Sequence, residues 1–391
     1  MDIRKVYLDN SATTFVSNDV LREMMPTFTT AFGNANSANS FGREALALVD
    51  LARERVAKAI GAKAEEIYFT SGGTEANNLA IKGIAYQLRD KGNHIITSCI
   101  EHDSVLNACK ALEKEGFSVT YLKADINGIV SLADLMHHIR KDTILISIMS
   151  ANNEIGTIQN LQAIAHTAHE KGIIFHTDAV QAFGAINFHV ADMGIDMMSI
   201  SSHKIYGPKG VGALYIRNGV QISPIINGGE QEGGVRGGTI NVPGVVGFGK
   251  ASEIAVRDLS INMHKIRVLR DHFLKNLSQK VTNYTLNGHP AQRLQGLLSI
   301  TFEGVEGEAL MTLLDMKGVA VSTGSACNSG SHLPSHVLTA IGLDTAQAKS
   351  TIRISIGKSN TKDELDYVVD CIADAVETLR SISPIRIKKN K

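Results

Sequence analysis

The chain has little cysteine and no excess of charge of either sign. Among its 391 residues are 4 cysteines, Cys99, Cys109, Cys327 and Cys371, and none form a CxxC pair. Neither a disulfide framework nor a zinc or other metal site is therefore indicated. Lysine and arginine (39) balance aspartate and glutamate (39), which argues against direct nucleic-acid binding as the main activity.

Long apolar runs are also missing. No run approaches the length needed to span a membrane, and residues 1–6 contain no apolar signal region. We therefore expect a cytoplasmic protein without a membrane partner. The basic run at residues 386–391 is expected to be a solvated end. At roughly 150 residues per domain, the length allows two or three domain-sized units.

Short apolar runs rich in β-forming residues alternate with helical patterns in the first part of the chain. The expected strands are Glu66–Thr70, His94–Ser98, Ser118–Leu122, Thr143–Ser150, Ile173–Thr177, Met197–Ser201 and Val211–Ile216. Helical patterns fill most of the gaps, at Glu75–Arg89, Asp103–Glu115 and Leu161–Lys171. The alternation predicts an α/β fold, a mostly parallel sheet with helices on both faces.

Beyond Gly244 the pattern changes. A long helical stretch, Ala251–Leu277, is followed by expected strands at Leu297–Phe302 and Thr351–Ile356 and helices at Glu308–Asp315 and Lys362–Ser381. This order predicts a second, smaller α+β domain.

Lys204 lies where the expected strand Met197–Ser201 runs into a turn. Taken alone, it is best interpreted as a lysine that extends from a strand end into solvent. A less common use of such a position is to hold a carbonyl cofactor as a Schiff base, because desolvation helps to free the amine.

Residues at two other strand ends favour the Schiff-base interpretation of Lys204. The turn Ser71–Glu75 opens a helix, where free N–H groups can seat a phosphate, although most such turns are plain connections. Asp178 precedes Lys204 by one expected helix and one strand, so it should lie at a neighbouring strand end; alone, it is typical of a helix N-cap. A lysine, a phosphate seat and an acid at one sheet edge are the parts that pyridoxal 5'-phosphate (PLP) needs.

Seven segments resemble the NifS/IscS-type cysteine desulfurases, which are class V aminotransferases. They are Tyr7–Thr14, Phe69–Asn78, Glu101–His102, Asn152–Gly156, His176–Gln181, Ser202–Gly210 and Gly324–Cys327. The resemblance implies the aspartate-aminotransferase-like (type I PLP) fold with a seven-stranded sheet. It also implies a large PLP-binding domain over 16–260, and a small α+β domain over 1–15 and 261–391 that carries a cysteine loop at about 322–334.

The resemblance also implies a role for each matching residue. Lys204 would form the covalent link to PLP, Asp178 would contact the pyridine nitrogen and Gln181 the ring hydroxyl. His102 would stack on the ring and move protons. The phosphate would be held by Gly73, Thr74, Ser201 and His203, together with Thr239 of the partner subunit in a homodimer.

Substrate binding and sulfur transfer are assigned in the same way. Asn153 and Arg353 would bind the substrate carboxylate, which an arginine fork can hold through two parallel hydrogen bonds. Read alone, Arg353 would be a solvated residue on an alternating strand, and His102 a capping or core histidine.

Cys327 lies in a stretch of small polar residues without core periodicity, so we expect an exposed loop, whereas Cys99 and Cys371 have apolar neighbours and should be buried. A thiolate on such a loop can attack the sulfur of the bound substrate, a step that a transaminase lacks. The implied reaction converts L-cysteine to L-alanine and passes a Cys327 persulfide to an acceptor protein, such as an Fe-S scaffold or a sulfur relay protein.

Three alternatives stay open at this point. A selenocysteine lyase shares the fold and does not depend on the loop cysteine. A dedicated sulfur donor for tRNA or phosphorothioate-DNA modification would differ only in its acceptor. A PLP-dead scaffold is disfavoured by the presence of Lys204, Asp178, His102 and Cys327.

The chain departs from the family pattern in two segments. Ala35, Asn36 and Asn39 stand where relatives usually show Pro, Ser and a nearby His, and Gly233 and Gly237 stand where Arg and Ser are common. These departures leave the catalytic set intact and put the shape of the site mouth in doubt.

Overall fold

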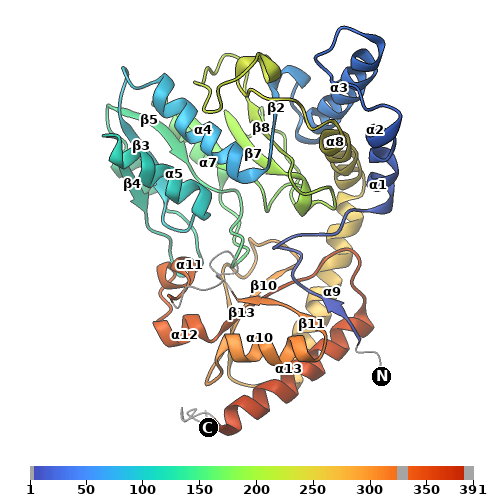
Figure 1. The fold of residues 1–391 in the computed structure, drawn as a ribbon. Helices are drawn as coiled ribbons and strands as arrows, with labels where there is room; N and C mark the ends of the chain where they lie inside the picture. The colour runs from blue at the N-terminus through green and yellow to red at the C-terminus, as the bar shows by residue number, and fades with distance from the viewer. Residues whose placement is uncertain (1–3, 324–332, 383–391) are drawn as a thin grey trace.

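The computed structural model describes residues 4–323 and 333–382. Figure 1 shows two parts. One is built on a large sheet and contains the first eight α-helices; the other contains the smaller sheet and the last helices. The helix α9 (Leu259–Lys280) runs along the smaller part and continues the chain from α8 of the larger one.

The large sheet has seven strands. In chain order they are β2 (Ile67–Thr70), β3 (His94–Ser98), β4 (Ser118–Leu122), β5 (Thr143–Ser147), β6 (Ile174–Asp178), β7 (Met197–Ser201) and β8 (Gly212–Ile216). Their spatial order is β2-β8-β7-β6-β5-β3-β4, and β8 alone runs antiparallel to its two neighbours. The predicted mostly parallel seven-stranded sheet is confirmed.

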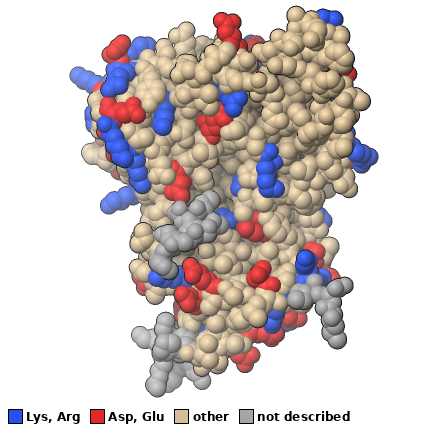
Figure 2. Space-filling model, in the orientation of Figure 1, with Lys and Arg blue, Asp and Glu red and all other residues tan. Residues whose placement is uncertain are grey.

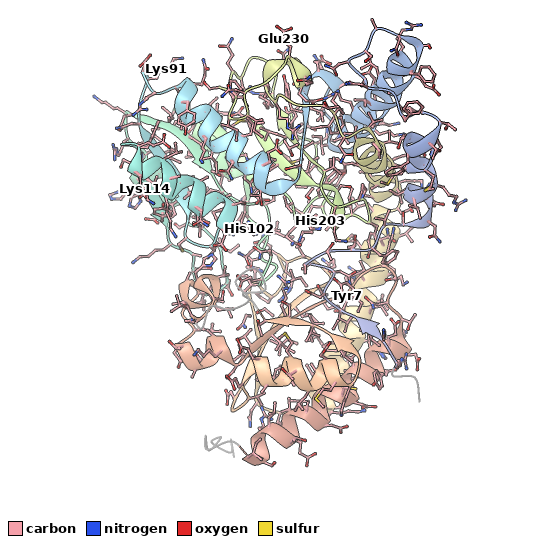
Figure 3. All side chains as sticks on the ribbon, in the orientation of Figure 1. Tyr7, Lys91, His102, Lys114, His203 and Glu230 are labelled. Atoms are coloured by element: carbon pink, nitrogen blue, oxygen red, sulfur yellow. The ribbon has the colours of Figure 1, made fainter. Side chains whose placement is uncertain are left out.

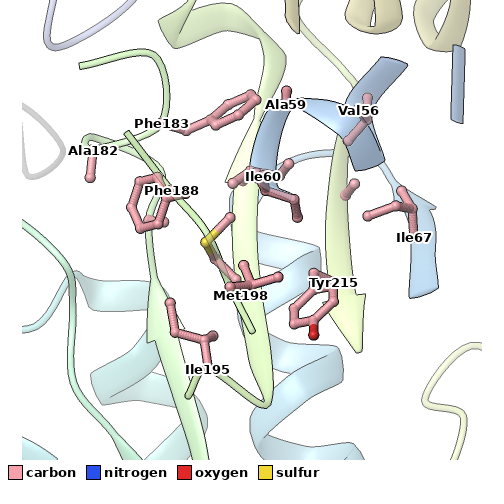
Figure 4. Packing of buried hydrophobic residues seen from close by; sticks show 14 of the residues in the cluster. Val56, Ala59, Ile60, Ile67, Ala182, Phe183, Phe188, Ile195, Met198 and Tyr215 are labelled. Carbon is pink, nitrogen blue, oxygen red and sulfur yellow. The ribbon is translucent and has the colours of Figure 1, made fainter. Parts of the chain in front are cut away.

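Helices cover both faces of this sheet. They are α1 (Asn18–Met24), α2 (Pro26–Thr29), α3 (Ser40–Ile60), α4 (Gly73–Gln87), α5 (Asp103–Lys114), α6 (Leu132–His138), α7 (Leu161–His169) and α8 (Val242–Arg257). Successive strand residues face opposite sides, so Met198 and Tyr215 pack with α3, α7 and α8, whereas Met197 and Leu214 pack with α4 and α5. Figure 4 shows Val56 and Ile60 of α3 beside Met198 and Tyr215 in the first of these cores.

The second part combines two small sheets. An antiparallel sheet has the order β12 (Ser322–Thr323), β13 (Thr351–Ser355), β10 (Leu297–Phe302) and β9 (Tyr284–Asn287), and β1 (Val6–Tyr7) pairs in parallel with β11 (Val319–Ala320). The remaining helices are α10 (Gly307–Met316), α11 (His336–Ala340), α12 (Thr345–Lys349) and α13 (Lys362–Ile382). Val6 and Leu8 belong to the core formed by these later elements. That shared core supports the division at 16–260 against 1–15 and 261–391, which stays a prediction.

Two expected helices differ in the structure. Residues 179–196, between β6 and β7, form turns instead of a helix, and Gly184 there has a positive φ of 78°, which interrupts helical geometry. The stretch Ala251–Leu277 is divided between α8 and α9, which meet at Asp258.

Asn39, one of the departures from the family pattern, has a structural use. Its side chain accepts a hydrogen bond from the Gly42 backbone at 2.9 Å and so caps α3, which ends at Gly61 in the left-handed conformation. Ala35, another of these departures, is buried in the core that α3, α7 and α8 form against the large sheet.

Basic and acidic side chains occur near one another on both parts of the face shown in Figure 2. Of the helices that the structure describes, none combines the length and the apolar character that crossing a bilayer requires. No group of three metal-ligating side chains is found within residues 4–323 and 333–382.

Candidate functional site

The chemistry-bearing residues meet at one edge of the large sheet. β6 and β7 are parallel neighbours, with Asp178 paired to Ser199, so Asp178 and the turn after β7 lie at the same edge. A cavity of about 320 Å³ opens there and is lined by ten of the expected residues: Gly73, Thr74, His102, Asn153, Asp178, Gln181, Ser201, His203, Lys204 and Arg353. In Figure 3, His102 and His203 lie at the side of the large domain that faces the small one.

One expected residue within the described part of the chain lies outside this cavity. Thr239 is exposed and lies outside the lining. Cys327 falls outside the residues that the structure describes.

Lys204 is fixed by the N-terminal segment. It ends a short 3-10 turn (Ser202–Lys204) directly after β7, and its Nζ donates to the backbone oxygens of Ser11 and Ala12, the latter at 2.9 Å. Gln181 Nε2 donates to the same Ser11 oxygen at 2.8 Å. These contacts hold the amine inside the cavity, where it shares the Ser11 backbone oxygen with Gln181.

Asp178 is the acid of the site and is only 6% exposed. Its Oδ1 accepts the Val180 backbone N–H at 2.9 Å, and its Oδ2 accepts from Asn77 Nδ2 at 2.7 Å. A carboxylate held in this way can keep a proton on a basic ring nitrogen placed beside it.

The phosphate seat combines a helix start with hydroxyl and imidazole groups. Gly73 and Thr74 begin α4, where backbone N–H groups have no helical acceptor. Ser201 Oγ is buried without a hydrogen-bond partner among the described atoms, so it can bond to a ligand. Burial and the nearby Lys204 and Lys209 lower the pKa of His203 to about 4, which makes it a neutral imidazole at pH 7.

Arg353 lies on β13 and is 3% exposed, not solvated as the strand pattern alone suggested. Its Nη1 donates to the Asn153 backbone oxygen at 3.0 Å, and its Nη2 lies 3.0 Å from Asp9 Oδ1. Its Nε is buried and has no partner among the described atoms. The arginine therefore retains binding capacity for a carboxylate.

The segment that carries Thr239 is tied to the large domain upstream of that residue. Glu232 pairs with Arg53 at 2.6 Å and accepts the Phe69 backbone N–H at 2.7 Å. Arg236 pairs with Glu75 at 2.8 Å, at the start of α4. A Cβ at Gly237 would lie 2.7 Å from the Gly228 backbone, so the serine common in relatives would require this backbone to move.

Other site residues received no role from the sequence: Asn77 and Glu154 lie within the matched segments, and Ser104 lies two residues after Glu101–His102. Asn77 and Ser104 line the cavity and bond to each other at 2.8 Å. Asn77 follows Thr74 by three residues, so both lie on one face of α4, a spacing that points to it. Glu154 is buried, accepts a hydrogen bond from Ser335, and has a pKa that burial raises to about 7. Because Glu154 and Ser335 lie far apart in the sequence, no local sequence pattern could have predicted this hydrogen bond.

Comparison with known proteins identifies the family. The model described as "Aminotransferase class-V" matches residues 6–368. The chain belongs to the class V aminotransferase family. The cysteine desulfurase IscS of Dictyoglomus turgidum is 50% identical over 383 residues, which cover 98% of this chain and 97% of that protein.

Solved structures agree with this assignment. A NifS-like protein matches with a TM-score of 0.90 and 40% identity over 96% of this chain and 100% of its own. The structure of SspA in complex with cysteine matches with a TM-score of 0.81 and 40% identity over 91% of this chain and 99% of its own. The type I PLP fold predicted from the resemblance is confirmed.

The cofactor of this class V aminotransferase is PLP. The cavity fits it: an acid for the ring nitrogen, a lysine amine, and, for the phosphate, a helix start together with a buried hydroxyl that has no partner among the described atoms.

Proposed function

We propose that the protein is a PLP-dependent cysteine desulfurase, which converts L-cysteine to L-alanine and retains the sulfur as a persulfide on Cys327. The observation that carries this proposal is a single cavity lined by the cofactor-type residues Lys204 and Asp178 and by the buried Arg353. The names of the matched relatives favour a cysteine desulfurase over a selenocysteine lyase or an inactive scaffold.

In this mechanism each residue of the cavity has a distinct task. Bound PLP supplies an electron sink for carbanion chemistry at the substrate. Asp178 holds the proton on the ring nitrogen, and the groups at the start of α4, with Ser201 and neutral His203, bind the phosphate. Arg353 and Asn153 orient the substrate carboxylate. Lys204 Nζ then removes the proton from the substrate α-carbon.

The sulfur step belongs to Cys327. Its thiolate attacks the substrate sulfur, so an S–S bond forms while the substrate Cβ–S bond breaks. The electron pair of the broken bond stays on the carbon skeleton, where Cβ takes up one proton from the site, and Lys204 returns the proton that it removed to the α-carbon, which completes alanine. The sulfur then leaves as a persulfide on an acceptor protein.

The three cysteines that the structure describes are poor candidates for this task. Burial raises the pKa of Cys109 to about 12 and also raises the pKa of the half-buried Cys99 thiol. Cys371 is 3% exposed in the small-domain core. Since the thiolate is the nucleophile, these environments favour Cys327 by elimination.

The proposal also covers the oligomeric state, the sulfur acceptor and the cellular location. We expect a homodimer in which Thr239 reaches the cofactor phosphate of the other subunit, and its exposure away from its own cavity supports this. The sulfur acceptor is expected to be an Fe-S scaffold or a sulfur relay protein, in the cytoplasm.

The test measures alanine released from L-cysteine by the full-length holoenzyme and by Lys204→Ala. The wild type should release alanine, and Lys204→Ala should fold and bind PLP without turning over. Lys91→Ala removes an exposed lysine outside the cavity and should retain activity. Alanine release by Lys204→Ala at a rate near that of the wild type would refute the proposal.

A further inference from the structure

A chain of buried hydrogen bonds connects Asp178 to His102. Asn77 is 1% exposed, and its Nδ2 lies 2.7 Å from Asp178 Oδ2 and 2.8 Å from Ser104 Oγ. Ser104 Oγ in turn lies 2.8 Å from His102 Nδ1. The Ser104 backbone N–H also points to Nδ1, at 3.1 Å, because His102 is the N-cap of α5.

The direction of each bond follows from Asp178. A carboxylate only accepts hydrogen bonds, so Asn77 must turn its NH₂ group toward it; the opposite amide orientation would place two acceptors 2.7 Å apart. The second N–H of Asn77 then points to Ser104 Oγ. This orientation leaves Asn77 Oδ1 buried without a partner among the described atoms, a cost that the two donated bonds offset.

The remaining steps decide which nitrogen of His102 carries the proton. The Ser104 backbone N–H points to His102 Nδ1, so this nitrogen accepts, and the Ser104 hydroxyl, which accepts from Asn77 through one lone pair, directs its single proton to the same nitrogen. Nδ1 thus accepts from both the hydroxyl and the backbone N–H of Ser104. A nitrogen that accepts two hydrogen bonds carries no proton, and the neutral imidazole holds its proton on Nε2.

We propose that Asn77 and Ser104 are positioning residues that fix the Nε2-protonated tautomer of His102, so that this histidine gives and takes protons through Nε2. The inference rests on the proposed function in one respect, namely that His102 exchanges protons with the substrate. Asn77 acts at a distance: it touches Asp178 and Ser104, and its effect on His102 passes through the Ser104 hydroxyl.

The tautomer of His102 can be measured on the enzyme in the absence of substrate. The full-length holoenzyme is labelled with ¹⁵N-histidine, and the His102 signals are assigned by their loss in His102→Gln. We expect the wild-type ¹⁵N shifts to show an unprotonated Nδ1 and a protonated Nε2. In Ser104→Ala, and also in Asn77→Ala, the preference for this tautomer should fall by roughly five- to tenfold, the effect of one lost hydrogen bond.

The controls separate this effect from damage to the fold. Asn78→Ala removes the neighbouring amide of α4, whose one partner among the described residues is the Thr74 backbone oxygen, and should leave the tautomer unchanged. Ser104→Thr keeps the hydroxyl and should restore it. A wild-type proton on Nδ1, or a tautomer ratio unaffected in Asn77→Ala, would overturn the proposal.

Kinetics give a second readout. Ser104→Ala should lower kcat for alanine formation by roughly five- to tenfold, with KM for cysteine nearly unchanged because Arg353 is untouched. A rise in KM alone would mean that Ser104 acts in binding, which contradicts the positioning role. If the wild type does not turn over cysteine, the proposed function fails, while the tautomer measurement still decides the present inference.

Discussion

Arg353 Nη2 lies 3.0 Å from Asp9 Oδ1, which joins the arginine of β13 to a carboxylate near the N-terminus. The pair is largely buried, with exposed side-chain fractions of 4% for Arg353 and 18% for Asp9. Asp9 also forms a parallel β-bridge with Ser355, so the N-terminal segment is held along the end of β13. The position of the proposed carboxylate-binding fork therefore depends on a residue remote in sequence.

Asp9→Asn should weaken binding of L-cysteine. The substitution keeps the shape of the side chain but removes the charge that orients the guanidinium, so KM should rise by roughly tenfold while kcat changes little. The control is Asp363→Asn, which removes the same group from the exposed Arg4–Asp363 pair and should leave KM unchanged. Equal KM values for Asp9→Asn and the wild type would show that Arg353 needs no such support.

Glu101→Gln should change how stability depends on pH. Glu101 is fully buried beside Ser98 and Met149, and burial raises its pKa from 4.5 to about 8. The folded protein thus keeps this proton up to about pH 8, whereas the unfolded chain releases it near pH 4.5. The stability from this group is complete below pH 4.5 and is lost as the pH rises toward 8.

Glutamine cannot ionise, so the unfolding midpoint of Glu101→Gln should rise relative to the wild type as the pH increases through this range. The gain is at most about 1.4 kcal/mol per pH unit, the value for one proton. Thermal unfolding of the holoenzyme at several pH values measures it, with Glu65→Gln as the control for loss of an exposed carboxylate. A difference that stays constant with pH would mean that Glu101 does not titrate in the folded protein as described.

Thr239→Ala should weaken retention of PLP. The hydroxyl is exposed in the single chain and is expected to bond to the phosphate in the other subunit, and loss of a hydrogen bond to a charged group should raise the Kd of PLP by roughly tenfold. Dialysis followed by absorbance gives the Kd, and Thr345→Ala at the exposed start of α12 is the control. A monomer with full activity in sedimentation and kinetic measurements would exclude the shared site.

Much of the large domain was predictable because its strands are short apolar runs that are buried on both faces, as β5 and β7 illustrate. The antiparallel direction of β8 and the lack of a helix between β6 and β7 could not be predicted, since both depend on how the turns connect distant strands. Lys204 and Asp178 could be placed at one edge from strand order alone.

Other site residues needed more than local pattern. Arg353 alternates with Ile352 and Ile354 as a surface residue would, yet it is buried because β13 lies against the segment that carries Asn153. The role of His102 came from the family resemblance, and its link to Asp178 depends on the bonds through Asn77 and Ser104, which join three separate segments.

Mass spectrometry of the cysteine peptides after exposure of the holoenzyme to L-cysteine tests the central claim most directly. We predict one added sulfur atom on Cys327 and none on Cys99, Cys109 or Cys371. Cys327→Ser should bind PLP and cysteine but form neither alanine nor persulfide, because serine gives no thiolate. Cys99→Ser, the half-buried thiol, is the control and should behave as the wild type. Added sulfur on another cysteine, with alanine formation retained in Cys327→Ser, would contradict the account.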